Sequence, residues 1–239
     1  MIWETKVTLE RIQLPEGNFL SLEIEELVNL EATIDALFIE LEKTGESALL
    51  EELCPYFGCV WPSARGLTEY LLEHSPEEKG GTRILEVGCG LAVPSLALAK
   101  HLKFSKIIAT DFHPEVPKFL AKNIARNRIS SDRFNYEPLD WRNPPENLAR
   151  FGVVMGSDVL YEKAHPADLA EALVRLVKPL GRVIIADPGR PYLPVFVEEM
   201  NARGFFAKPR VYTVPADPVR GETLPHSTKD VQVFDFRKP

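Results

Sequence analysis

The sequence predicts an α/β protein whose main domain is a doubly wound, mostly parallel sheet of seven strands, preceded by a β-hairpin and a helical extension. From residue 83 onward, short apolar segments alternate with segments of helical periodicity, which is the order expected for a parallel sheet with helices on both faces. The apolar segments are rich in Ile and Val and show little polar alternation, as strands buried on both faces do. The chain of 239 residues is long enough for one globular domain with an extension.

The N-terminal part of the chain has a different pattern. Two alternating segments, residues 6–14 and 19–25, are separated by turn residues and predict a β-hairpin. Helical spacing follows from residue 29 to about residue 53, and Gly45 interrupts it before a second short piece. We expect residues 1–54 to form an extension that serves as a lid or a substrate platform, and residues 55–239 to form the main domain.

The elements of the main domain follow in a regular order. Ser63 is predicted to cap a helix that ends near residue 74, and the stretch 76–81 separates this helix from the sheet. The last two apolar segments have no helix between them, which predicts a pair of antiparallel strands at the end of the chain. The expected strands are 83–87, 106–110, 134–138, 153–156, 182–186, 210–214 and 231–236, and the expected helices are 94–101, 116–127, 166–177 and 193–203.

Composition and charge narrow the classes of partner. The net charge of -7 disfavours broad attraction to nucleic acids or anionic membranes, so neither is expected as a partner. No apolar run reaches the roughly 20 residues that a membrane-spanning helix needs, and the start of the chain does not resemble an export signal. Three cysteines suit a reducing compartment, so we expect a cytoplasmic protein. Cys54 and Cys59 lack further ligands at metal-binding spacing, and no metal is expected.

The strongest functional signal is the segment 84–94, in which a strand leads through a glycine turn into a helix. Gly88 and Gly90 let the backbone turn sharply and approach a ligand closely. Asp111 ends the next strand, where an acid can hydrogen-bond both ribose hydroxyls of an adenosine cofactor. Glu86 suits the cationic methionine end of S-adenosylmethionine (SAM). These residues therefore predict a SAM site, with S-adenosylhomocysteine as the product.

Two alternatives to a SAM site are a dinucleotide-binding turn and a purely structural turn. Dinucleotide turns have the pattern G-x-G-x-x-G and place a pyrophosphate at the start of the helix. Val93 stands where that pattern needs a small residue, and Glu86 would repel the pyrophosphate. Both features favour SAM.

Other residues at the same edge of the sheet are candidates for the cofactor site. Asp140 and Trp141 follow the third strand, where a polar group and an aromatic plane can contact adenine; the alternative is a helix cap beside a core tryptophan. Trp61 either covers the cofactor or packs the extension onto the sheet. Ser157, at the end of the fourth strand, is predicted to reach the methyl-donor end of the cofactor.

Asp158 and Tyr161 follow the fourth strand, where a methyl acceptor must arrive. The triplet Asn-Pro-Pro at 143–145 is part of a motif of enzymes that methylate amides or nucleobases, but it precedes the fourth strand and is interpreted as a loop. An aliphatic amine fits better, although freeing the lone pair of a protonated lysine at pH 7 costs roughly 4–5 kcal/mol. We predict that Asp158 orients the amine while Tyr161 lines its channel, with in-line positioning as the main source of rate. The structural alternatives are a helix cap for Asp158 and a core aromatic for Tyr161.

These motifs resemble those of the seven-strand class I methyltransferases with a Rossmann-like fold, and within them the family 16 group. Its lysine-directed members carry Asp-x-x-Phe/Tyr after the fourth strand, and residues 158–161 match that pattern. The likeness extends over residues 55–206, although Ala92 stands where many such motifs have a third glycine and the extension before Cys54 has no match. Residues 61–62, 86–90, 111, 139–141 and 187–190 are similar to the electron-transfer flavoprotein β-subunit lysine methyltransferases and to bacterial relatives described as nicotinamide N-methyltransferase-like.

The resemblance implies methyl transfer to a lysine of a protein substrate. The other functions to be weighed are methylation of a small amine, a heterocycle or another protein side chain, a SAM-binding module without turnover, and an NAD-dependent oxidoreductase. Labelled methyl transfer from SAM separates the first two from the others, because only a methyltransferase produces a methylated product.

Overall fold

A sheet of seven strands forms the centre of the computed structural model, which describes residues 3–75, 82–102, 105–145, 149–216 and 227–239. The strands are β3 (Arg83–Val87), β4 (Lys106–Asp111), β5 (Phe134–Pro138), β6 (Phe151–Ser157), β7 (Val177–Asp187), β8 (Pro209–Pro215) and β9 (Thr228–Phe236). Their spatial order is β5-β4-β3-β6-β7-β9-β8. The first five in this order pair in parallel, and β9 is antiparallel to both β7 and β8. The predicted fold class is confirmed.

The strand boundaries lie close to the predicted ones, with one exception. β7 begins well before residue 182, because Val177 pairs with Phe151 at the start of β6. Residues 143–145 form a loop, as predicted. The separating stretch 76–81, and Glu146 after the loop, lie outside the described residues.

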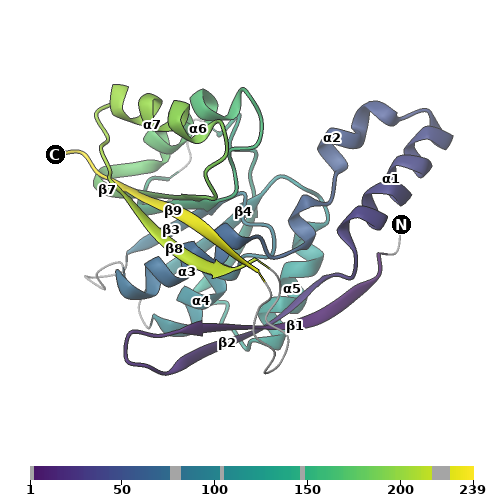
Figure 1. Cartoon of the computed structure of the whole chain (residues 1–239), viewed down its shortest axis with the longest axis horizontal. Coiled ribbons are helices and arrows are strands. Elements are labelled where there is room, and N and C mark those ends of the chain that lie inside the picture. The colour runs from purple at the N-terminus through teal and green to yellow at the C-terminus, as the bar shows by residue number, and fades with distance from the viewer. Residues whose placement is uncertain (1–2, 76–81, 103–104, 146–148, 217–226) are drawn as a thin grey trace.

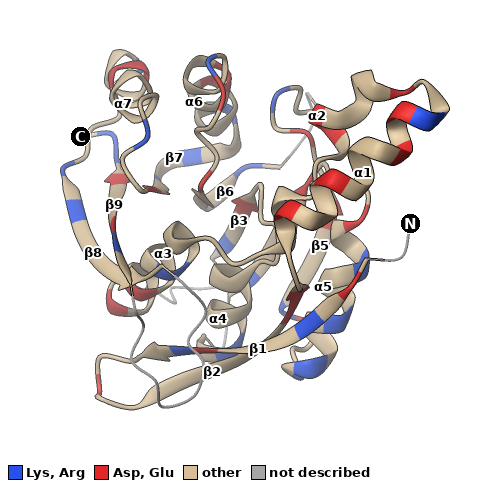
Figure 2. Ribbon diagram, turned by 45° about the vertical axis from the view of Figure 1, so that its right-hand side comes forward, with Lys and Arg blue, Asp and Glu red and all other residues tan. Residues whose placement is uncertain are grey.

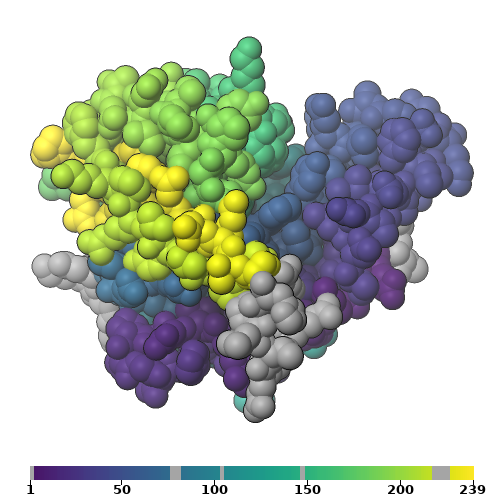
Figure 3. Space-filling model, viewed as in Figure 1, coloured from purple at the N-terminus to yellow at the C-terminus, as the bar shows by residue number. Residues whose placement is uncertain are grey.

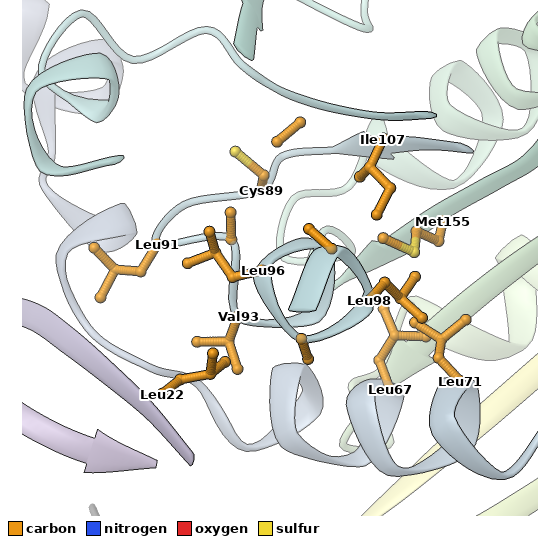
Figure 4. Packing of buried hydrophobic residues seen from close by; sticks show 14 of the residues in the cluster. Leu22, Leu67, Leu71, Cys89, Leu91, Val93, Leu96, Leu98, Ile107 and Met155 are labelled. Carbon is orange, nitrogen blue, oxygen red and sulfur yellow. The ribbon is translucent and has the colours of Figure 1, made fainter. Parts of the chain in front are cut away.

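Helices cover both faces of the sheet (Figure 1). Neighbouring residues of a strand point to opposite faces, so Ile84 belongs to one hydrophobic core and Leu85 to the other. Figure 4 shows the first core, where Leu67, Leu96 and Ile107 come from two helices and a strand. The helices on this face are α3 (Pro62–Glu73), α4 (Val93–His101) and α5 (Val116–Arg126), and those on the other face are α6 (His165–Leu176) and α7 (Leu193–Ala202).

The N-terminal hairpin packs on the outside of the first helical layer. It consists of β1 (Thr5–Gln13) and β2 (Phe19–Leu27), and Leu22 and Ile24 of β2 are fully buried. α4 is buried without interruption from Val93 to Ala99, as expected for a helix that is covered on both sides and needs no polar face there. The hairpin is thus part of the same core as the sheet.

Polar side chains of α5 complete the backbone bonding of β2. The N–H of Glu25 donates to Asn123 Oδ1 (2.7 Å), and the N–H of Glu23 donates to Asn127 Oδ1 (3.0 Å). Asn127 Nδ2 donates in return to the Glu23 carbonyl (2.7 Å). Because unpaired backbone groups of an edge strand are costly when buried, these two asparagines take the place of a third strand.

A buried ion pair ties the hairpin to α3. Arg65 donates from Nε to Glu10 Oε2 (2.8 Å) and from Nη2 to Glu10 Oε1 (2.7 Å), and its Nη1 donates to the carbonyl of Pro215 (3.0 Å). Both side chains are almost completely buried. Removing one partner of such a pair typically costs about 3–5 kcal/mol, because it leaves a buried charge uncompensated.

The remainder of the extension is a helical arm. It comprises α1 (Leu30–Thr44), the short helix η1 (Ser47–Leu49) and α2 (Leu50–Leu53). Asn29 caps α1 by accepting the N–H of Ala32 (3.1 Å), and Gly45 ends it with a φ of 75°. The buried residues of α1 are Leu37 and Leu41, and the arm stands off the body of the molecule (Figure 3). Its role as a lid or platform stays a prediction.

The start of α3 differs from the prediction. Ser63 does not cap the helix: the N-cap is Trp61, and Pro62 occupies the first turn. The N–H of Ser63 instead donates to Asp158 Oδ2 (3.1 Å), so a residue distant in the sequence supplies the cap. Among the described helices, none has the length and apolar character that crossing a bilayer requires.

Candidate active site

A cavity of about 380 Å³ opens at the carboxyl ends of β3, β4, β6 and β7. It lies where the chain order of the strands reverses between β3 and β6, the position at which doubly wound sheets bind ligands. Its volume is within the range of roughly 300–1,000 Å³ usual for small-molecule sites. Eight of the predicted site residues line it: Trp61, Gly88, Gly90, Asp111, Trp141, Ser157, Asp158 and Tyr161.

The glycine turn forms one wall of the cavity. Gly88 and Gly90 have φ values of 60° and 50°, in the left-handed region that favours glycine. A Cβ on Gly88 would lie 2.8 Å from Cγ1 of Val159, and one on Gly90 would lie 3.2 Å from the carbonyl oxygen of Phe57. The absence of a side chain at both positions therefore lets Val159 and Phe57 pack directly against the turn.

Ala92 continues the turn in the same conformation. It precedes α4 with a φ of 56° and a ψ of 35°, and it is almost fully buried. Glycine would adopt this conformation without the steric cost that a Cβ brings. The departure from the third glycine thus places an alanine in a strained position.

Asp111 connects the glycine turn to the end of β4. Its Oδ2 accepts the N–H of Gly90 (2.9 Å), and its Oδ1 accepts the N–H of His113 (3.0 Å). Burial raises the pKa of this carboxyl, while the two backbone N–H groups oppose the rise. Asp111 therefore holds the turn in shape and also lines the cavity, where the ribose role stays a prediction.

Glu86 lies beneath the cavity and is not among the described residues that line it. Its Oε2 accepts the N–H of Ser95 (3.2 Å) in the first turn of α4, and its Oε1 has no hydrogen-bond partner among the described residues. Burial raises the pKa of Glu86 to about 8. The carboxyl is therefore largely protonated near neutral pH.

The side chains of Trp141 and Asp140 have different surroundings. The indole of Trp141 is buried against the cavity, edge-on to His165 at 5.1 Å between ring centroids. Asp140 pairs with Arg142, whose Nε is 2.8 Å from Oδ1, and it is not among the described lining residues. Only Trp141 of the two is placed to contact a ligand in this cavity.

Trp61 lies at the start of α3, between the arm and the cavity. It lines the cavity, and its Nε1 donates to the carbonyl of Tyr56 (2.8 Å) in the short helix η2 (Tyr56–Gly58). The same indole thus lines the cavity and holds η2 against the start of α3, and its role in covering the cofactor stays a prediction.

The acceptor end of the cavity is built around Asp158. This residue follows β6 with a φ of 58°, and its side chain is 8% exposed. Its Oδ2 caps α3 through the N–H of Ser63, and its Oδ1 lies 2.7 Å from Nη1 of Arg190. The helix-cap alternative is therefore correct in part, since Asp158 both caps a helix and lines the cavity.

Tyr161 stands at the mouth of the cavity. Its ring lies edge-on to His165 at 4.6 Å and tilted to Tyr56 at 6.3 Å. Desolvation and the nearby charge of Glu162 raise the pKa of Tyr161 to about 12. The phenol therefore stays neutral and contributes shape and a hydroxyl group rather than a base.

Sequence reasoning missed several residues of the wall. His113 anchors the end of the arm: its Nδ1 accepts the N–H of Glu115 (3.2 Å), and its Nε2 is 3.1 Å from the carbonyl of Leu53. Its position two residues after Asp111 was the available signal. Arg190, in the segment 187–190 that carries the resemblance, also lines the cavity.

Residues 52–202 match the model of the lysine methyltransferase family. The chain belongs to this family. Its cofactor is the SAM that the glycine turn predicts, and the turn and Asp111 line the cavity in which such a ligand would bind. The predicted family is thereby confirmed.

Relatives found by sequence include two that are named as protein-lysine methyltransferases and one from Xenopus laevis that is named as a histone-arginine methyltransferase. The human electron transfer flavoprotein beta subunit lysine methyltransferase is 29% identical over 148 residues, covering 57% of this chain and 50% of the relative. The calmodulin-lysine N-methyltransferase of Arabidopsis thaliana is 26% identical over 124 residues, covering 50% of this chain and 40% of the relative. The match thus spans about half of the length of these relatives.

Solved structures support the fold alone. The precorrin-6y C5,15-methyltransferase of Geobacter metallireducens has a TM-score of 0.55 and 16% identity, covering 66% of this chain and 80% of its own. Its name describes methylation of a different kind of acceptor. Similarity of fold therefore leaves the acceptor to be argued from the site.

Proposed function

We propose that this protein transfers the methyl group of SAM to a lysine side chain of a protein substrate. The observation that carries the proposal is the junction of two sets of residues in one cavity. Gly88, Gly90 and Asp111 form the cofactor side, and Asp158 and Tyr161 form the acceptor side. Membership of the lysine methyltransferase family supports the choice of acceptor.

Methyl transfer requires the protein mainly to position a neutral amine against the methyl group of SAM. When bound, SAM supplies a methyl group on a positively charged sulfur, which is already activated for transfer. The acceptor amine must first lose a proton, at a cost of roughly 4–5 kcal/mol at pH 7. Asp158 then accepts a hydrogen bond from the amine, and the walls hold the nitrogen in line with the methyl group.

The charge around the cavity suits a cationic acceptor. Glu51 of α2 lines the cavity, and Figure 2 shows further acidic residues along α1 and α2. Carboxylates beside a site raise the local concentration of cations and favour their approach. A basic segment of a protein is attracted to this face, and the same field disfavours polyanions.

The first test is transfer of a labelled methyl group from SAM into a cell lysate separated into proteins and small molecules. We expect label in a protein band and, after digestion, on lysine. Label confined to small molecules would contradict the proposal and indicate a metabolite methyltransferase. SAM binding without any labelled product would indicate a binding module.

Two substitutions separate the cofactor side from the acceptor side. Asp111→Ala should weaken SAM binding about tenfold or more, because it releases the turn and removes the ribose partner. Asp158→Asn should leave SAM affinity within about twofold and lower turnover at least about 100-fold, since its amide oxygen retains the cap on α3 but no charged acceptor remains to orient the amine. Calorimetry and labelled transfer measure the two effects.

Asp158→Ala serves as the matched variant, because it removes the cap as well as the charge. It should lose transfer and also about 0.5–2 kcal/mol of unfolding free energy. Full turnover of Asp158→Asn would refute the acceptor role.

We further propose that the protein is located in the cytoplasm, which fractionation of cells would test.

A further inference from the structure

Arg190 lies at the acceptor end of the cavity, beside the carboxylate proposed to receive the amine. Its Nη1 is 2.7 Å from Asp158 Oδ1 and 3.3 Å from Asp187 Oδ2. Arg190 and Asp158 line the cavity, whereas Asp187 is fully buried. One guanidinium therefore joins two carboxylates, and we call this cluster the carboxylate–guanidinium triad.

The backbone around Arg190 is held by the same triad. Asp187 ends β7, and its Oδ1 accepts the N–H of Gly189 (2.8 Å) and the N–H of Arg190 (2.7 Å). Gly189 turns the chain with a φ of 89°. The carbonyl of Arg190 then accepts the N–H of Leu193 (3.0 Å) where α7 begins. The turn that carries Arg190 is thus fixed by hydrogen bonds at both of its ends.

Asp158 is held equally well from its own side. Its N–H donates to the carbonyl of Ala186 (3.1 Å), and its Oδ2 accepts the N–H of Ser63 (3.1 Å). These two bonds fix the carboxylate of Asp158, so its Oδ1 stays beside the guanidinium of Arg190. An amine that reaches Asp158 therefore arrives beside a positive charge.

That charge matters because the acceptor must be neutral to attack. A buried carboxylate without a counter-ion stabilises the ammonium form of a neighbouring amine and opposes the loss of its proton. A guanidinium beside the carboxylate offsets this effect, since like charges disfavour the protonated amine. The carboxylate then remains a hydrogen-bond acceptor without holding the amine in its charged form.

We propose that Arg190 is a positioning residue that holds Asp158 in place and, by its positive charge, favours the neutral form of the acceptor amine. This inference rests on the proposed transfer to lysine. The proton leaves to solvent before attack; the nitrogen lone pair then forms the N–C bond, while the S–C bond breaks and its electrons stay on sulfur.

The other titratable groups near the acceptor end do not change charge between about pH 7 and 9. Burial raises the pKa of Cys59 and of Tyr161 to about 12, and the contact with Cys54 raises that of Tyr56. Burial lowers the pKa of His165, so this imidazole is neutral in the same range. The charged neighbours of Tyr161 are Glu162 and Arg142.

The test compares the wild type with Arg190→Gln and Arg190→Lys, using methyl-labelled SAM and the purified lysate protein that the wild type labels. For Arg190→Gln we expect kcat about tenfold lower at pH 7, a rise of kcat displaced by about one pH unit to alkaline pH, and no increase in KM. Arg190→Lys retains the charge, so its pH profile should follow that of the wild type.

The outcomes separate electrostatics from structure. An unchanged pH profile in Arg190→Gln, whatever the loss of rate, would overturn the proposal, and so would a higher KM with a pH-independent loss of kcat. If the wild type labels no lysine in any protein, the proposed function fails first and this inference falls with it. A labelled lysine with unshifted profiles isolates failure of the inference alone.

Three controls keep the comparison interpretable. Thermal unfolding and SAM affinity are measured for each variant at each pH, so that titration on the cofactor side cancels. Intact mass shows whether the introduced lysine is itself methylated. If Arg190→Gln does not fold, Arg190→Met offers an uncharged side chain of similar length and is expected to show the same alkaline displacement.

Discussion

The two walls of the cavity are assembled in different ways. The cofactor wall comes from one stretch of chain, in which the N–H of Gly90 in the turn after β3 donates to Oδ2 of Asp111 at the end of β4. The acceptor wall comes from separate segments, since α3, the loop after β6 and the turn after β7 meet at Asp158. Backbone conformation shapes the first wall and side-chain charge shapes the second.

Each side of the cavity has one buried carboxylate, and the two carboxylates differ in whether a cation lies beside them. Glu86 lies under the cofactor wall, with no cation within ion-pair distance among the described residues, and burial raises its pKa to about 8. Asp158 is also buried, but Arg190 and the N–H of Ser63 oppose the rise of its pKa. One side of the cavity thus tolerates a protonated acid, whereas the other retains a carboxylate with its counter-ion.

The largest effect is expected when a side chain is added to the cofactor wall, whose shape depends on backbone conformation. Gly88→Ala should abolish measurable SAM binding and cost about 2–5 kcal/mol of unfolding free energy, because it adds left-handed strain and a contact of 2.8 Å with Val159. Calorimetry and denaturant unfolding measure both effects.

The matched control is Gly17→Ala. Gly17 has a φ of 88°, and a Cβ there would meet no described atom within 4 Å. It should therefore show only the strain, about 1–2 kcal/mol, with SAM affinity unchanged. Equal behaviour of the two variants would mean that the cofactor wall does not depend on the missing side chain.

The comparison of the two carboxylates is sharpened by Glu86→Gln. Since the folded pKa of Glu86 is raised from 4.5 to about 8, its favourable contribution is complete below pH 4.5 and is lost as the pH rises towards 8. The stability of the variant relative to the wild type should increase by roughly 4 kcal/mol between pH 5 and pH 9, because one pKa unit corresponds to about 1.4 kcal/mol. Thermal unfolding without cofactor, followed across this pH range, gives the result.

Asp158→Asn is the counterpart on the acceptor side. It should show no such gain at alkaline pH, because Arg190 would lose the nearer of its two carboxylate partners. A Glu86→Gln variant with no gain near pH 9 would show that the ionised Glu86 is compensated after all, and the contrast between the walls would disappear.

The smallest effect concerns the strained alanine of the cofactor wall. Ala92→Gly should raise the free energy of unfolding by about 0.5–1 kcal/mol, since relief of the left-handed strain outweighs the added freedom of the unfolded chain. Ala97→Gly makes the same change inside α4 and should instead lower it by about 1 kcal/mol or more. A loss of stability in Ala92→Gly would contradict the assignment of strain.

Local pattern was sufficient for much of the molecule. The periodicity of Ile and Val predicted the parallel strands, and the spacing of Gly88, Gly90 and Asp111 predicted the cofactor wall, because strand ends and tight turns depend on neighbours in the chain. The hairpin and the break at Gly45 followed from the same kind of signal. Such features are encoded within a few residues and can be read without knowing what packs against them.

The tertiary structure alone decided which polar groups meet. The cap that Ser63 was expected to supply comes from Asp158, and Arg190 and Asp187 complete that site from another strand. Asn123 and Asn127 finish the edge of a hairpin that lies far away in the chain. The pattern of apolar residues determines which faces are buried, but partners for buried polar groups depend on distances between elements, and those arise only when the layers pack.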